Sequence, residues 1–209
     1  MPTGIPIRDI RQQLFDAAER VLLRDGPDAL TSRAVTTEAG VAKGILHRHF
    51  PDFDAFLAAL VLSHLERLDA CSADLRAFAG TETVTENLAR ALTDALDPGA
   101  LRIISLVGCR RALLARLRLT TPRGIPLLSE TSTMIAAYLT AERGLGRIAL
   151  EADVDTLAVI LVGAAHLVAA DQDEDRPDPD ELRDVVGTAI DSVLRTPRAP
   201  SRPGQASGR

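Results

Sequence analysis

The strongest constraint on the fold is a pair of short helical patterns separated by a glycine, which spans Leu30 to Phe50 and reads LTSRAVTTEAGVAKGILHRHF. Thr31 can act as the N-cap of the first helix, because its hydroxyl can accept a hydrogen bond from an amide of the first turn. Gly40 begins a tight connection, and the residues from Lys43 onward have helical spacing again. Two helices joined in this way are typical of a helix-turn-helix, whose second helix enters the major groove of DNA.

The second helix of this pair has two distinct faces. At about 100° per residue, Leu46 and Phe50 point to one side and can pack against the rest of the domain. The other side carries polar or small residues that stay accessible, namely Lys43, Gly44, His47 and Arg48. The pattern therefore predicts one packing face and one face that contacts DNA.

This segment resembles the DNA-binding motif of the TetR family of bacterial one-component repressors. The resemblance covers the AGV triplet at Ala39–Val41, Gly44 and the run His49–Pro51. It implies an N-terminal three-helix head, a long fourth helix and a helical C-terminal bundle for ligand binding and dimerisation. The ligand domains of this family share a fold but little sequence, so the effector cannot be identified from the sequence.

Three positions depart from the family pattern. Ala42 stands where a serine usually caps the recognition helix, His47 stands where a tyrosine is usual, and Phe53 stands where the next helix usually has a lysine. Each of these positions normally helps to hold phosphate. Loss of the serine cap weakens the local helix by on the order of 1 kcal/mol. Loss of the lysine removes one positive charge that would neutralise a phosphate and release its counterions.

The resemblance assigns DNA contacts to residues of this chain. The base-contacting set is Arg33, Lys43, Gly44 and Ile45, the phosphate-contacting set is Ser32, His47, Arg48 and His49, and Thr31 and Ala42 complete the predicted interface. Guanine opposite Arg33 or Lys43 is the strongest pairing, because both side chains can donate to O6 and N7. A solvated surface charge at Arg33 and a structural role for His49 are the alternatives.

Charge is distributed unevenly along the 209 residues, whose net charge is −5. Residues 1–50 contain seven Lys and Arg against six Asp and Glu, so the remainder contains 17 against 23. Association with DNA depends on the local electric field, so an acidic body is compatible with a DNA-binding head.

The sequence contains neither an apolar run of ~18 residues nor a signal-peptide pattern, and we expect a cytoplasmic protein with no membrane partner. Cys71 and Cys109 are expected to be buried free thiols.

The remaining apolar clusters have helical period, so the sequence predicts an all-α fold of about nine helices. We expect a helix-turn-helix DNA-binding domain at 1–51, a ligand-binding and dimerisation domain at 52–195, an exposed acidic connector at 171–178 and a disordered tail at 196–209. Capping residues and prolines mark the predicted helix starts: Asp52 before the fourth helix, Thr83 with Glu86 before the fifth, Asp97-Pro98 before the sixth, Asp153 before the eighth and Asp178-Pro179 before the ninth. Glycines and prolines mark the predicted helix ends: Asp25-Gly26-Pro27 after the first helix, Gly80 after the fourth, residues 121–126 after the sixth and Gly144 after the seventh.

The last two helices have small and β-branched residues at near-heptad spacing, which suits either an intramolecular core or a four-helix bundle made by two copies. Resemblance to the TetR family, whose members dimerise through these helices, favours the homodimer. The predicted interface is Leu157, Leu161, Ala164, Ala165, Val168, Leu182, Val185, Ala189, Ile190 and Val193. A two-fold dimer would read a palindromic operator in double-stranded DNA.

Polar residues set among apolar ones in the body are candidates for a ligand site, although each alone is more often a satisfied core residue. The candidates are His64, Ser105, Cys109, Thr133, Tyr138 and His166. A cationic stripe at Arg110, Arg111, Arg116 and Arg118 is expected to be a solvated face. Hydrolase, zinc-protease and phosphate-loop motifs are lacking, so we expect no enzyme activity, no metal and no cofactor.

These features predict a sequence-specific DNA-binding regulator, a repressor by family default, that an unknown small-molecule effector releases from its operator. An activator would have the same sequence features. The alternative function is a helical small-molecule carrier or interaction module with a degenerate head.

Overall fold

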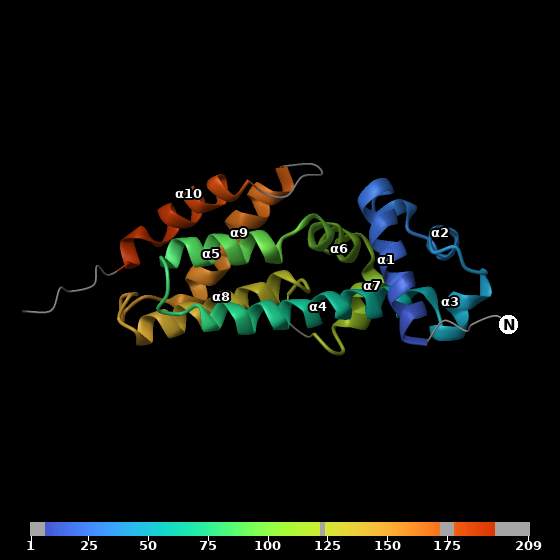
Figure 1. Cartoon of the computed structure of the whole chain (residues 1–209), viewed down its shortest axis with the longest axis horizontal. Helices are drawn as coiled ribbons and strands as arrows, with labels where there is room; N and C mark the ends of the chain where they lie inside the picture. Colours follow the sequence, from blue (N-terminus) through green and yellow to red (C-terminus); the bar gives the residue numbers. More distant parts are fainter. Residues whose placement is uncertain (1–6, 122–123, 172–177, 195–209) are drawn as a thin grey trace, which may run out of the picture.

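The computed structural model describes residues 7–121, 124–171 and 178–194. These residues form ten α-helices and no β-strand, which confirms the predicted all-α class (Figure 1). The α-helices are α1 (Ile7–Asp25), α2 (Ser32–Glu38), α3 (Gly44–His49), α4 (Phe53–Ala77), α5 (Val84–Ala95), α6 (Pro98–Cys109), α7 (Arg111–Leu117), α8 (Leu128–Gly144), α9 (Val154–Asp171) and α10 (Pro179–Ile190). The 3₁₀ turns η1 (Pro27–Ala29) and η2 (Asp191–Val193) complete the fold.

The predicted capping residues begin the helices. Each cap accepts a hydrogen bond from an amide of the first turn, which would otherwise lack a partner. The pairs are Thr31 with Ala34, Asp52 with Ala55, Thr83 with Glu86, Asp97 with Ala100, Asp153 with Thr156 and Asp178 with Asp180. Most helix starts could therefore be located from local sequence alone.

The structure differs from the prediction at one break and one helix end. The predicted sixth helix is interrupted at Arg110, where the backbone is extended, with φ −114° and ψ 94°. Arg110 donates from Nη2 to the carbonyl of Leu30 at 2.8 Å, and its guanidinium lies 5.7 Å from the centre of the Phe53 ring. A contact with distant residues therefore accompanies the break. The fourth helix ends at Ala77 rather than at Gly80.

The helices form an elongated molecule with α1, α2 and α3 at one end and α5, α9 and α10 toward the other (Figure 1). In the body, α8 packs on α9, and α10 packs on α5 and α9. The long α4 starts beside α3 and continues along α8, so it joins the two ends. One continuous cluster of buried apolar side chains runs from Leu14 in α1 to Ile190 in α10.

A cluster of polar side chains is buried in the body beside the loop that joins α4 to α5. Glu142 is fully buried and accepts hydrogen bonds from the Tyr138 hydroxyl at 2.5 Å, the Gly80 amide at 3.2 Å and the Arg147 guanidinium at 3.2 Å. Asn87 donates from Nδ2 to the Tyr138 hydroxyl at 3.0 Å. Burial and the hydrogen bond to Glu142 raise the pKa of Tyr138 above its usual range, so the phenol stays protonated.

The two cysteines are free thiols, as expected, but the prediction that both are buried is wrong. Cys71 is half-buried on α4, and Cys109 is exposed where α6 ends. The break after α6 leaves Cys109 at a helix end instead of on an inward face. Most of the predicted acidic connector and the predicted tail at 196–209 lie outside the described residues.

Candidate DNA-binding surface

The recognition helix α3 is held by an aromatic cluster beneath it. Leu46 and Phe50 are buried, as the spacing predicts. The Phe50 ring lies 6.0 Å from the Phe15 ring and 5.1 Å from the Phe56 ring, measured between centroids. The Arg11 guanidinium lies 4.4 Å from the Phe50 centroid, within the range of a cation–π contact. The end of α3 is thus fixed to both α1 and α4.

Polar contacts fix α2 against α1. Gln13 donates from Nε2 to the carbonyl of Ala39 at 2.8 Å. Arg20 and Arg24 both donate to Glu38, the last residue of α2, at 2.8 and 2.9 Å. Hydrogen bonds from these arginines outweigh desolvation and lower the pKa of Glu38. The chain then turns at Gly40, whose φ of +66° favours glycine.

Most predicted DNA-contacting side chains lie on the surface of α2, α3 and the turn between them. Thr31, Arg33, Ala42, Lys43, Gly44, His47 and Arg48 are exposed, whereas Ser32, Ile45 and His49 are half-buried. The Ser32 hydroxyl is covered by the protein and has no hydrogen-bond partner among the described residues, so it would have to rotate to reach a phosphate. The Thr31 hydroxyl caps α2.

The N-terminus of α3 lacks a side-chain cap, as expected from the alanine at position 42. Lys43 is the N-cap residue of α3 and makes no side-chain capping hydrogen bond. Ala42 contributes only its carbonyl, which accepts from the Ile45 amide at 2.9 Å. The first amides of α3 are therefore left to other acceptors, and a helix N-terminus favours negatively charged ones.

Residues 14–60, which include this surface, match the family model described as bacterial regulatory proteins, tetR family. Most of the chain also superposes on a solved TetR-family structure. A family member from Streptomyces coelicolor A3 is 26% identical, with a TM-score of 0.60 over 88% of this chain and 99% of that one. The segment at 14–60 thus matches the DNA-binding region of the TetR family, and most of the chain shares the fold of a TetR-family member.

Two further solved structures share the fold of this chain at lower identity. A transcriptional regulator from Rhodococcus sp. Rha1 is 20% identical, with a TM-score of 0.65 over 88% of this chain and 95% of that one. The multidrug binding protein EbrR, solved with malachite green, is 24% identical, with a TM-score of 0.62 over 88% of this chain and 99% of that one. No match was found among curated protein sequences.

Two of the six predicted ligand residues line the same groove, and the other four lie elsewhere. Ser105 and His166 line a groove of about 870 Å³ between α1, α6 and α9. Tyr138 belongs to the buried cluster around Glu142, and His64 is buried with Nε2 3.0 Å from Glu19. Thr133 is exposed and donates to its own helix, and Cys109 is also exposed. The residues missed by the prediction include Arg20 and Leu23, which belong to the head.

The predicted solvated arginine stripe is partly engaged with residues that flank α2 and α3. Arg116 donates from Nη1 and Nη2 to the two carboxylate oxygens of Asp52, at 2.8 and 3.1 Å. These hydrogen bonds, with the amide of Ala55, lower the pKa of Asp52. Arg110 contacts Leu30, as described above, whereas Arg111 and Arg118 are exposed. Two of the four arginines therefore link the body to the residues that flank α2 and α3.

The predicted dimer residues lie mostly on the inner faces of α9 and α10. Leu157, Leu161, Ala165, Leu182 and Ile190 are buried inside a single chain, and Ala164, Val168, Val185, Ala189 and Val193 are half-buried. The buried side chains fill the core between α8, α9 and α10, so in this conformation they offer no surface to a second copy. The opposite face of α9 exposes Val159, Ile160 and Leu167, at 63%, 53% and 73%.

None of the helices in the described residues is long and apolar enough to cross a membrane. Within the same residues, His, Cys, Asp and Glu side chains do not gather in groups that could hold a metal ion.

Proposed function

We propose that the chain is a ligand-responsive repressor that reads a palindromic operator as a homodimer. The observation that supports this proposal is the exposure of Arg33, Lys43 and Gly44 together on the outer surface of the helix-turn-helix. Arg33 and Lys43 can each donate to O6 and N7 of guanine, and Gly44 permits close approach of the backbone. His47 and Arg48 follow on the same helix, where they can donate to phosphate.

We infer that the dimer forms through the outer face of α9. Val159, Gly163 and Leu167 are four residues apart and share one helical face, and all three are exposed. A Cβ added to Gly163 would meet nothing within 4 Å, so its backbone is open to close approach by a second helix. Burial of this apolar face would place two recognition helices about one DNA turn, or a small multiple, apart.

The experiment is selection of DNA from a random pool by the purified full-length chain at near-physiological salt, followed by sequencing. We expect an enriched palindrome, because a two-fold dimer presents the same reading surface twice. Failure of the folded protein to enrich any sequence, with and without extracts containing small molecules, would contradict the proposal and favour the carrier function.

Single-residue variants then test which side chains contact the selected DNA site. Each good bidentate base contact contributes about 1–3 kcal/mol, so we expect Lys43→Ala and Arg33→Ala to weaken binding by roughly 5- to 150-fold. Arg76→Ala is the matched control, because it removes an exposed arginine from the far part of α4. Fluorescence anisotropy measures the affinities, and circular dichroism checks the fold. Unchanged binding by both head variants would contradict the assigned contacts.

A further inference from the structure

The groove between α1, α6 and α9 has an apolar floor. Leu101 and Ile104 of α6 line it together with Ile125, which precedes α8, and Ala169 of α9. Its volume of about 870 Å³ falls within the range of sites for small organic molecules. A molecule in this groove would touch both the head and the body.

The polar part of the groove carries positive charge. Arg20, Arg24 and Arg102 line it, and none of its lining residues is acidic. Arg20 uses Nε for Glu38, and its two terminal nitrogens make no hydrogen bond within the described part of the chain. A guanidinium presented in this way can bind a carboxylate through two parallel hydrogen bonds. The groove therefore combines an apolar surface with a cationic end.

His166 provides a second polar group on the α9 wall. Its Nδ1 is covered by the protein and has no hydrogen-bond partner among the described residues. A covered ring nitrogen without a partner is uncommon, because desolvation of the nitrogen is not compensated. The ring can therefore turn toward a ligand without losing a hydrogen bond at Nδ1, while Ser105 on α6 offers a hydroxyl nearby.

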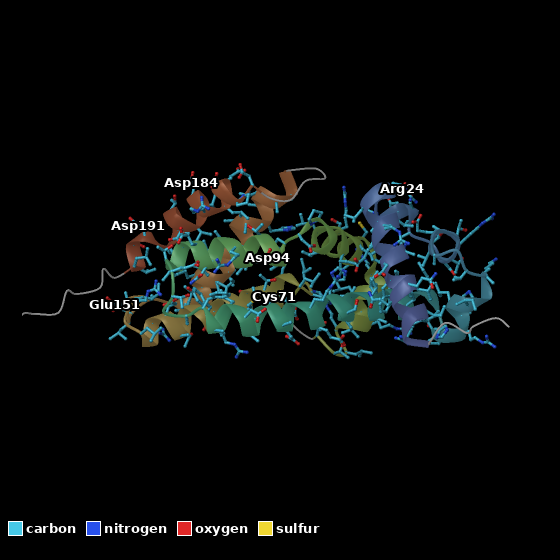
Figure 2. All side chains as sticks on the ribbon, in the orientation of Figure 1. Arg24, Cys71, Asp94, Glu151, Asp184 and Asp191 are labelled. Carbon is cyan, nitrogen blue, oxygen red and sulfur yellow. The ribbon has the colours of Figure 1, made fainter. Side chains whose placement is uncertain are left out.

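The cationic end of the groove also holds the helix-turn-helix. Figure 2 shows Arg24 at the end of α1, beside α2, and its Nη1 lies 2.9 Å from Glu38. Arg20 binds the other carboxylate oxygen of Glu38 at 2.8 Å. Both arginines line the groove and clamp the last residue of α2. An anion in the groove would compete with Glu38 for the same positive charges.

We propose that the groove is the effector site and that it binds a small carboxylate attached to an apolar body. The carboxylate binds Arg20 and draws it from Glu38, which loosens α2 from α1 and displaces α3. Such a ligand favours a head conformation that fits DNA less well, which is the differential binding that release requires. This inference rests on the proposed function for its effect on DNA, but not for the binding itself.

Calorimetry on the full-length protein without DNA tests the site with 1-naphthylacetate and decanoate as probes. The neutral control is 1-naphthylacetamide, which has the same ring system without the charge. We expect both carboxylates to bind and the amide to bind about tenfold more weakly, because it cannot replace a charge-assisted hydrogen bond. Equal binding of naphthylacetate and its amide, or no binding of either carboxylate by folded protein, would overturn the proposal.

Single-residue variants test whether the carboxylate probe binds in this groove. Ser105→Trp fills it from an exposed position on α6 and should abolish binding, whereas Arg20→Gln should weaken carboxylate binding about tenfold. Arg118→Gln is the matched control for the lost charge. Glu38→Gln removes the competing carboxylate and should tighten carboxylate binding severalfold, and Glu66→Gln, an exposed glutamate on α4, should leave it unchanged. Full binding by Ser105→Trp would place the probe elsewhere and refute the site.

The DNA readout separates this inference from the proposed function. A protein that selects a palindrome and binds neither carboxylate keeps the proposed function and loses the effector site. A protein that binds naphthylacetate as expected and selects no DNA keeps the site and loses the proposed function. When both hold, naphthylacetate should weaken operator binding by wild type, and Ser105→Trp should remove this response.

Discussion

The head and the body hold their polar groups in different ways. In the body, Glu142 is closed off from solvent and receives hydrogen bonds from three directions. In the head, Arg20 and Arg24, which clamp α2 through Glu38, have side chains that are 52% and 58% exposed. Exposed ion pairs contribute little to stability, whereas a buried network is costly to break. The body is therefore built to be rigid, and the head is built to be adjusted.

The largest expected effect is on the stability of the body, the more rigid of the two regions. Glu142→Ala removes the acceptor shared by Tyr138 and Arg147. The Tyr138 hydroxyl is then buried without an acceptor, whereas Arg147 keeps its hydrogen bond to the carbonyl of Thr81. We expect the free energy of unfolding to fall by about 3 kcal/mol, since loss of one partner of a buried pair is strongly destabilising. Urea denaturation followed by circular dichroism measures this change.

Glu66→Ala serves as the control for this prediction, because Glu66 is exposed on α4. Its free energy of unfolding should stay within about 0.5 kcal/mol of wild type. Glu38→Gln in the head should also change the stability much less than Glu142→Ala does. Equal losses from the head and body variants would remove the distinction between the two regions.

The same comparison explains which features could be predicted from the sequence. The head depends on local signals: Thr31 caps α2, Gly40 takes a positive φ, and the spacing of Leu46 and Phe50 sets the buried face. Such signals act within a few residues, so they can be interpreted without knowledge of the fold. The predicted helix starts in the body rest on caps of the same kind.

The features that could not be predicted depend on contacts between distant segments. The break at Arg110 accompanies contacts with Leu30 and Phe53, both distant in sequence. The helix α9 is apolar on both sides, with Leu161 buried and Leu167 exposed, so periodicity alone could not separate the inner face from the outer one. The groove joins α1 to α9, which are far apart in sequence.

A smaller effect is expected where the body holds the head in position. Arg116 binds both carboxylate oxygens of Asp52, which caps α4 directly after the recognition helix. We expect Arg116→Gln to weaken operator binding about threefold, because a loosened head occupies the binding orientation for a smaller fraction of the time. Fluorescence anisotropy on the selected operator measures this change, and Arg118→Gln, at the end of the same helix, is the control. Loss of affinity in the control as well would point to general electrostatics.

The smallest effect concerns pH and the contact between α1 and α4. Glu19 of α1 lies 3.0 Å from His64 Nε2 and 2.9 Å from Arg67 Nη2, both on α4. Desolvation opposes ionisation of Glu19, but the hydrogen bond and charge of His64, together with Arg67, outweigh it and lower the pKa of Glu19 below 4.5. Because the pKa is lower in the folded state, the carboxylate stabilises the fold above about pH 4.5.

This contribution is lost as the pH falls through the lowered pKa of Glu19, because protonation then removes the charge that His64 and Arg67 face. Urea midpoints measured for wild type and Glu19→Gln from pH 6 to pH 3 isolate the effect. We expect wild type to be more stable above pH 4.5 and the two proteins to converge at the acid end. Parallel curves across the whole range would show that the Glu19 carboxylate does not link the head to the body.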